Sequence, residues 1–376
     1  MVLLCVIPID FNSWRHFSSF SPSSSRAPRK WMRFNSTSKG TIDLLDKIRA
    51  KTILKHYHHN PYEYGAIATD AYIGTPAQYA WLIVDTVDSD VSITLCPSPD
   101  YQPADDMCFI YQDSSTFKRL SDHTASDLIQ PLFDTEAFSS FTFATRKAPT
   151  CFLGTIGLAQ GSKARYPGET VPYERWIGGK PINAFSLYYA NCGGSIGFGT
   201  NYACDVNNDT LYLNTTSEKY WQFEMDGVEL EDVKIAVKSQ AVINTVKDYI
   251  GMPKKFLKEF TSKYSIPWDG LYGAYTVPCN ATSYLPDLNF KAQNGILTIK
   301  ATHYVYTEEP LPNGKCVLDF EDSQAFGFGP EWYFGLQIIQ DYCVGFSWPS
   351  YSLKGWPPVP LPGVISFTKN SKMGLC

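Results

Sequence analysis

The sequence has no run of apolar residues close to the ~18 that a membrane-spanning helix requires, so no membrane span is expected. It also has no Cys-x-x-Cys pair, which argues against a zinc ribbon. Charged residues make up only 18% of the 376 residues, and the formal net charge is −5. Because this charge offers no basic face for phosphates, nucleic acid is not expected as a partner, and an anionic membrane surface is disfavoured in the same way.

The residues that are abundant favour β-structure. Aromatic side chains reach 15%, and the chain contains 26 Gly and 25 Pro, a balance typical of many short strands joined by turns. The length exceeds that of an average single domain. We therefore expect an all-β protein with two lobes and a few short helices.

Cysteines and glycosylation signals indicate an oxidising compartment. The ten cysteines are scattered as in proteins whose disulfides close loops. The apolar segment 2–9 is similar to the core of a secretory signal, although it lacks a basic flank. Four sequons mark N-glycosylation candidates at Asn35, Asn208, Asn214 and Asn280. We expect a glycoprotein that is secreted or lies in the lumen of the secretory pathway.

The pattern along the chain divides it into three parts. Residues 1–55 read as a flexible leader or pro-segment, followed by lobes at 56–190 and 191–376. The apolar spacing over 41–57 predicts a short helix, and the spacing over 252–264 predicts another one. Elsewhere strand and turn patterns dominate from residue 62 onward.

Several short segments occur in an order that is typical of one family. They are YIGTPAQ at 72–78, LIVDT at 82–86, TIGLA at 155–159, GGSIGFG at 193–199, YWQFEMDGV at 220–228, VINT at 242–245 and WYFG at 332–335. Over roughly 60–350 the chain resembles the pepsin-like aspartic proteases. The resemblance implies a bilobal, pepsin-like acid protease fold, with two related β-lobes and a cleft between them.

The resemblance places the catalytic positions at Asp85 and Asn244. Enzymes of this family hold two Asp carboxylates that share one proton, so that one activates water while the other protonates the peptide carbonyl. Asp85 is retained, but the amide of Asn244 cannot take up or release that proton. We therefore expect that peptide hydrolysis is lost.

Other family positions also differ. Val87 and Val246 stand where each motif carries Gly, and we expect these β-branched residues to distort the turns. The resemblance puts Leu120 near the flap Tyr and His123 at a flap Gly, so the cleft cover is expected to be reshaped. The residues expected to line the cleft are Thr86, Val87, Ser89, Leu120, Thr245 and Val246.

Three functions stay open. The first is a monomeric pseudoenzyme, without cofactor or metal, that holds an extended peptide or protein in the inter-lobe cleft. The second is an endopeptidase that uses Asp85 with a substitute acid, for which the candidates are Asp88, Asp90 and Asp248. The third is a serine hydrolase built on Ser195 and His303, but that motif demands a strand-to-helix elbow, and a turn-rich segment follows Ser195.

Disulfide pairings can be suggested for six cysteines. The resemblance implies that Cys96 pairs with Cys108 and that Cys279 pairs with Cys316. Cys192 with Cys204 would brace the intervening hairpin. Four cysteines remain unassigned, namely Cys5, Cys151, Cys343 and Cys376.

Overall fold

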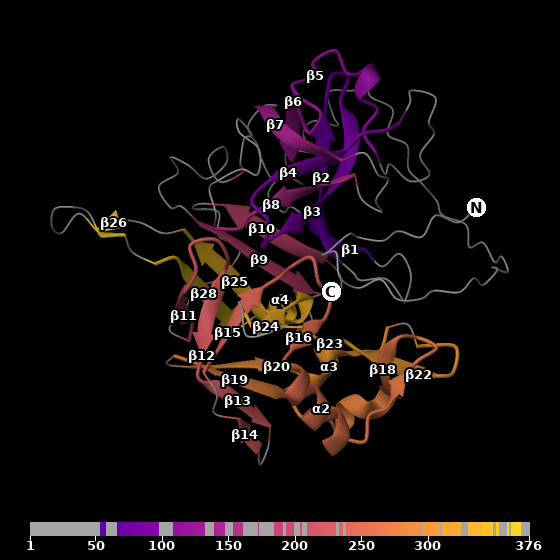
Figure 1. Ribbon diagram of the computed structural model, residues 1–376, viewed down its shortest axis with the longest axis vertical. Coiled ribbons are helices and arrows are strands. Elements are labelled where there is room, and N and C mark those ends of the chain that lie inside the picture. The colour runs from indigo at the N-terminus through magenta and orange to yellow at the C-terminus, as the bar shows by residue number, and fades with distance from the viewer. Residues whose placement is uncertain are drawn as a thin grey trace, which may run out of the picture.

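The structure is a computed structural model, and it describes residues 53–57, 66–97, 108–131, 139–146, 153–160, 172, 184–190, 193–198, 204, 209–230, 233–235, 238–293, 295–308, 310–324, 330–348, 351–352, 359–360 and 362–369. Strands dominate these residues, as expected from the aromatic, Gly and Pro content. Figure 1 shows an upper N-terminal half and a lower C-terminal half, joined by strands that run through the centre. No helix in these ranges is long and apolar enough to cross a membrane.

A sheet of 13 strands extends from the N-terminal half into the C-terminal half. In spatial order its strands are β11 (Leu211–Asn214), β28 (Val364–Lys369), β25 (Tyr342–Ser347), β9 (Ala184–Ala190), β10 (Gly193–Phe198), β1 (Ile53–Tyr57), β2 (Ala66–Ile73), β3 (Gln78–Asp85), β8 (Gly154–Gly157), β4 (Val91–Thr94), β7 (Ser139–Arg146), β6 (Thr124–Pro131) and β5 (Lys118–Arg119). Strands β9 and β25 pair antiparallel, with Leu187 opposite Val344, so the two halves share this sheet.

Smaller sheets complete the C-terminal half. The five-stranded sheet contains β12 (Gln222–Met225), β15 (Ser239–Ile243), β24 (Trp332–Phe334), β16 (Ile250–Met252) and β23 (Phe320–Asp322). One four-stranded sheet contains β14 (Val233–Ile235), β13 (Gly227–Leu230), β19 (Leu288–Ala292) and β20 (Gly295–Ile299). The other contains β17 (Trp268–Asp269), β18 (Ala274–Pro278), β22 (Lys315–Leu318) and β21 (Val305–Tyr306), and β26 (Tyr351–Ser352) pairs with β27 (Val359–Pro360).

Among its described residues, the C-terminal half has three α-helices: α2 (Lys254–Lys263), α3 (Ala301–Tyr304) and α4 (Leu336–Asp341). The helix predicted at 252–264 is confirmed, because α2 begins after Pro253 and buries Phe256, Leu257 and Phe260. The helix predicted over 41–57 is wrong at its C-terminal end, where β1 pairs with both β2 and β10. Pairing on both sides outweighs the local apolar spacing there; residues 41–52 lie outside the described residues.

The same four-strand unit occurs twice. In the N-terminal half β3 runs parallel to β8, β8 is antiparallel to β4, and β4 is parallel to β7. In the C-terminal half β15 runs parallel to β24, β24 is antiparallel to β16, and β16 is parallel to β23. This repeat puts the end of β3 and the end of β15 in equivalent positions, which agrees with the two motif positions that the resemblance assigned to Asp85 and Asn244.

An aromatic cluster fills the core where the halves meet. Phe185 of β9 stacks on Phe346 of β25 with ring centroids 4.5 Å apart, and Trp221 packs edge-on against both rings. The buried indole N–H of Trp221 donates to the carbonyl oxygen of Leu158 at 2.7 Å. These contacts fix the two repeated units relative to one another.

Candidate active site

The two motif turns meet through Thr86 and Thr245, both of which are fully buried. The backbone N–H of Thr86 donates to Thr245 Oγ1 at 3.1 Å, and the backbone N–H of Thr245 donates to Thr86 Oγ1 at 3.2 Å. Each hydroxyl then donates to a strand carbonyl, Thr86 to Ile243 at 2.9 Å and Thr245 to Val84 at 2.6 Å. The turns are thus held together by a symmetric network of buried hydrogen bonds.

Asp85 ends β3, directly before this contact, and its side chain folds back onto the turn. Its Oδ1 accepts the backbone N–H groups of Val87 at 2.7 Å and Asp88 at 3.0 Å. Burial raises the pKa of Asp85 from 3.8 to about 6, and the two backbone N–H groups hold the pKa from rising further. The nearby carboxylate of Asp88 adds to the rise, while Arg146 opposes it.

Asn244 occupies the equivalent position after β15 and is buried. Its Oδ1 accepts the backbone N–H of Val246 at 3.2 Å, which repeats the bond from Val87 to Asp85. The backbone N–H of Asn244 donates to the carbonyl oxygen of Phe334 at 2.9 Å. The turn geometry therefore needs only a side-chain oxygen here, and an amide supplies it as well as a carboxylate would.

Val87 and Val246 do not prevent the turns from closing. Neither is among the described residues with a positive φ, so a β-branched side chain meets no left-handed strain at these positions. The hydrogen bonds between Thr86 and Thr245 are made in spite of both valines. The expectation that the valines distort the turns is therefore not supported at this contact.

Gly157 and Gly335 allow a close backbone approach behind each turn. A Cβ on Gly157 would lie 2.6 Å from the carbonyl oxygen of Asp88, and a Cβ on Gly335 would lie 2.5 Å from that of Lys247. Such contacts are far inside van der Waals distance, so both positions require glycine. The close approaches at Gly157 and Gly335 lie in equivalent places of the repeated unit, as the two turns do.

Two residues that the motif comparison did not single out, Asp319 and Gln337, lie behind the second turn. Gln337 Nε2 donates to the backbone oxygen of Asp248 and, at 3.2 Å, to Asp319 Oδ2. Burial, together with the Asp248 carboxylate, raises the pKa of Asp319 well above its ordinary value, and burial lowers the pKa of Lys247. Asp319 and Gln337 follow no sequence motif, so only the fold could bring them to this turn.

The segment expected to replace the family's flap forms a β-hairpin. Lys118 and Arg119 of β5 pair with Ser126 and Ala125 of β6, and Leu120 begins the connecting turn with 55% of its surface exposed. The backbone N–H of Leu120 donates to Thr124 at 3.1 Å. Ser89, another expected cleft residue, lies in the first motif turn and donates its backbone N–H to Asp88 Oδ1 at 2.8 Å.

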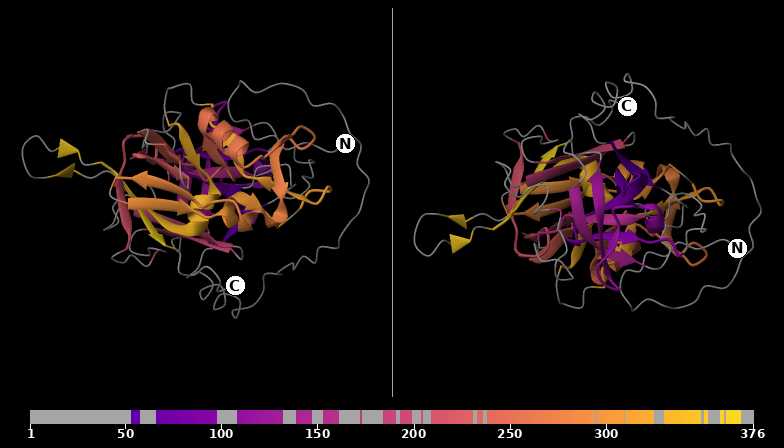
Figure 2. Two further views of the ribbon diagram at one scale, coloured as in Figure 1. Left: turned by 90° about the horizontal axis from the view of Figure 1, so that it is seen from below. Right: turned by 90° about the horizontal axis from the view of Figure 1, so that it is seen from above.

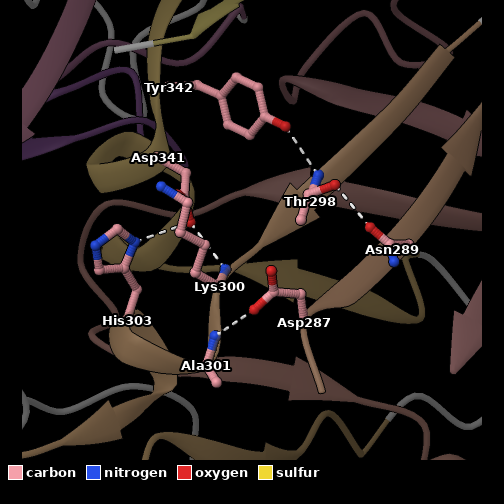
Figure 3. Close-up of polar contacts among 8 residues, drawn as sticks. All are labelled: Asp287, Asn289, Thr298, Lys300, Ala301, His303, Asp341 and Tyr342. Carbon is pink, nitrogen blue, oxygen red and sulfur yellow. Dashed lines mark hydrogen bonds and ion pairs between the residues drawn. The ribbon is translucent and has the colours of Figure 1, made fainter. Parts of the chain in front are cut away.

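The residues of the serine hydrolase alternative are not arranged as that chemistry requires. Ser195 lies inside β10, between Ile53 and Tyr188 on the neighbouring strands, and not on a strand-to-helix elbow. His303 Nδ1 lies 2.8 Å from Asp341 Oδ2, which also accepts the backbone N–H of Lys300 at 3.1 Å (Figure 3). This carboxylate joins α3 to α4, so the hydrolase hypothesis lacks its required geometry.

One expected disulfide is wrong. The structure bonds Cys96 to Cys108 and Cys279 to Cys316, the two pairs that the resemblance implies, but Cys204 is bonded to Cys343 and not to Cys192. Residue separation favoured the nearer partner, whereas the sheet brings Cys343 of β25 beside Cys204. Every cysteine in the described ranges is disulfide-bonded; Cys192 lies outside them.

Two of the four sequons can be placed. Asn214 ends β11 and Asn280 lies in a 3-10 turn after β18, and both side chains are exposed. Asn35 and Asn208 lie outside the described residues. Disulfides together with accessible sequons fit a protein of the secretory pathway.

The duplicated four-strand unit has one motif turn per copy, and the hydrogen bonds between Thr86 and Thr245, here called the threonine lock, join the copies. This arrangement agrees with the bilobal acid protease fold that the sequence predicts. A sequence model of the family described as eukaryotic aspartyl protease matches residues 136–353, a range that begins after Asp85. The chain belongs to this family.

Relatives in animals agree with this assignment. The chain is 29% identical to aspartic protease 17 of Caenorhabditis elegans over 198 residues, which is 50% of each chain. It is 26% identical to a renin of Echis ocellatus over 337 residues, or 79% of this chain and 80% of the renin. It is 25% identical to pepsin II-1 of Oryctolagus cuniculus over 312 residues, or 73% and 76%. The match thus spans only about half of aspartic protease 17 but most of the renin.

Proposed function

We propose that this chain is a pseudoenzyme of the aspartic protease family, which binds peptide or protein segments without cleaving them. The observation that carries the proposal is the pair of equivalent side-chain oxygens at the two turns. Asp85 Oδ1 and Asn244 Oδ1 each accept the N–H two residues further along, but only Asp85 has a carboxyl group. One ionisable group cannot act as base and acid in the same step.

A retained binding role is supported by the backbone structure that the two turns and their strands keep. The threonine lock, the two close glycine crossings and the duplicated strands are all stabilising features, and none of them needs a second carboxylate. We propose that the occupant is an extended segment held between the lobes by strand-like backbone pairing. We propose also that the protein is a monomer with lobes at 56–190 and 191–376. We propose further that it is glycosylated and belongs to the secretory pathway.

A second candidate is an endopeptidase in which Asp88 replaces the missing acid. Its support is the electrostatic effect of the Asp88 carboxylate on Asp85, which places the two groups within interaction range. Asp90 is a weaker candidate because it is buried, with 4% of its surface exposed. Asp248 is weaker too, because it interacts with Asp319 behind the second turn.

The deciding experiment is acid-pH proteolysis by the purified, glycosylated protein on a mixed peptide library. Asp85→Ala and Asp88→Asn variants are assayed beside it. The pseudoenzyme predicts no cleavage by any of the three proteins. Cleavage that disappears in both variants establishes the endopeptidase with Asp88, and cleavage that only Asp85→Ala abolishes points to a different second acid.

A further inference from the structure

The most exposed apolar side chains of the described residues lie together on one hairpin. Leu271 is 82% exposed and Trp268 is 57% exposed, more than any other large hydrophobic side chain in those ranges. Both belong to the β17–β18 hairpin, whose turn is formed by residues 270–273. A Cβ added to Gly270 or Gly273 would have no atom within 4 Å, so the tip projects freely from the body.

The hairpin is stiff although its tip is exposed. Trp268 faces Tyr275 across the two strands, with the rings edge-to-face at 5.0 Å. The backbone N–H of Leu271 donates to Asp269 Oδ1 at 3.1 Å, which fixes the turn. Strand β18 pairs in turn with β22, and the disulfide from Cys279 to Cys316 ties the far end. The apolar tip is therefore presented in a fixed conformation.

A basic helix lies directly before the hairpin. α2 buries its apolar face, and its exposed face carries Lys254, Lys255, Lys258 and Glu259. With Lys263 the helix has four lysines and one glutamate, a formal charge of +3 in a chain of net charge −5. In the part of the chain that the structure describes, Lys254, Lys255 and Lys258 form no ion pair.

The basic helix and the apolar tip are neighbours. Four residues separate Lys263 from Trp268, a distance of at most ~18 Å even for a fully extended chain. Figures 1 and 2 show α2 beside the β18 sheet, at the end of the C-terminal half away from β5. The net charge of −5 for the whole chain disfavours an anionic membrane surface, but the formal charge of α2 is +3.

We propose that this end of the C-terminal half docks on an anionic lipid surface. Trp268 and Leu271 enter the headgroup layer, and the α2 lysines face the lipid phosphates. A convex apolar tip suits a soft layer that it can penetrate, whereas a protein partner would need a matching hollow to bury it. The lysines and the tip act additively, so neither one alone gives full binding.

The test is co-sedimentation of the full chain with vesicles at moderate salt. Phosphatidylcholine vesicles that contain phosphatidylserine are compared with pure phosphatidylcholine vesicles. Binding to the anionic vesicles alone is expected, and raising the salt should weaken it. Equal binding to both kinds of vesicle, or no binding to either, overturns the proposal.

Matched variants assign the contact. The double variant Trp268→Ser/Leu271→Ser and the triple variant Lys254→Gln/Lys255→Gln/Lys258→Gln should each lower partitioning at least tenfold. Ile296→Ser on β20, which is 52% exposed, is the apolar control, and Lys238→Gln is the charge control; both should bind like the parent. All substituted side chains are exposed. The pairing of β18 with β22 and the disulfide from Cys279 to Cys316 still hold the hairpin when the Trp268–Tyr275 ring contact is removed, so unfolding curves should stay close to that of the parent. Retained binding in the double and triple variants contradicts the proposed surface, and capture of an acidic peptide without vesicle binding assigns the lysines to a protein partner.

Discussion

Thr86 and Thr245 lie 159 residues apart in the sequence, yet each donates its backbone N–H to the hydroxyl oxygen of the other. This contact joins the two copies of the repeated unit next to Asp85 and Asn244. It has survived although Asn244 has replaced one of the expected carboxylates. The stability that the joined turns provide and the acid–base chemistry of Asp85 and Asn244 can therefore be tested separately.

Removing one hydroxyl of the lock should destabilise the protein. Thr245→Val leaves the buried N–H of Thr86 without its acceptor, so we expect a loss of about 2–3 kcal/mol in the free energy of unfolding. The measurement is equilibrium urea unfolding followed by tryptophan fluorescence.

The matched control for the lock is Thr276→Val. Thr276 is also buried, but its Oγ1 has no hydrogen-bond partner among the described residues, so the substitution should be neutral or slightly stabilising. Equal losses for the two variants would mean that the hydroxyl pair contributes nothing beyond threonine packing.

The raised pKa of Asp85 should make stability depend on pH. The folded carboxyl has a pKa of about 6 against 3.8 unfolded, so the native state binds more protons between these values and its stability falls as the pH rises. Asp85→Asn keeps the acceptor for Val87 and Asp88 but cannot ionise. It should match the parent near pH 3.5 and exceed it by about 2–3 kcal/mol at pH 7.

Urea unfolding of the parent and of Asp85→Asn at intervals from pH 3.5 to 7 measures this difference directly, because all other titrating groups are shared. A constant difference across that range would show that Asp85 has an ordinary pKa in the folded protein.

Restoring the second carboxyl should restore some hydrolysis. Asn244→Asp gives both turns an ionisable oxygen at equivalent positions, so we expect acid-pH cleavage of a peptide library at least a hundredfold above the parent. The double variant Asn244→Asp/Asp85→Asn moves the single carboxyl to the other turn and should be inactive. If Asn244→Asp stays inactive while folding normally, the altered residues around the turns, and not the lost acid alone, prevent catalysis.

The long-range disulfide should stabilise more than the local one. Cys204 and Cys343 are separated by 139 residues, whereas Cys96 and Cys108 are separated by 12. Loop-closure entropy predicts losses of about 5 kcal/mol for Cys204→Ala/Cys343→Ala and about 3 kcal/mol for Cys96→Ala/Cys108→Ala. Urea unfolding compares the two variants.

Peptide mapping under non-reducing conditions checks the pairing itself. A cross-linked peptide that contains Cys204 and Cys343 is expected. A peptide that joins Cys192 to Cys204 would instead support the pairing suggested by sequence proximity and would contradict the structure.

Much of this protein was determined by its sequence alone. The aromatic, Gly and Pro content predicts strands, the ordered motifs identify the family and fold, and Asn244 in the second motif removes an ionisable group whatever the surrounding structure is. The helix after Pro253 could also be predicted, because its periodic apolar residues and its starting signal agree.

Other features were decided only by the tertiary structure, since they depend on residues far apart in the sequence. Residues 53–57 carry part of a helical pattern but become β1, because strands on both sides offer backbone partners. Cys204 pairs with a distant cysteine because the shared sheet carries Cys343 beside it. Asp319 and Gln337 belong to no motif, yet the fold packs them behind the second turn, where burial raises the pKa of Asp319 well above its ordinary value.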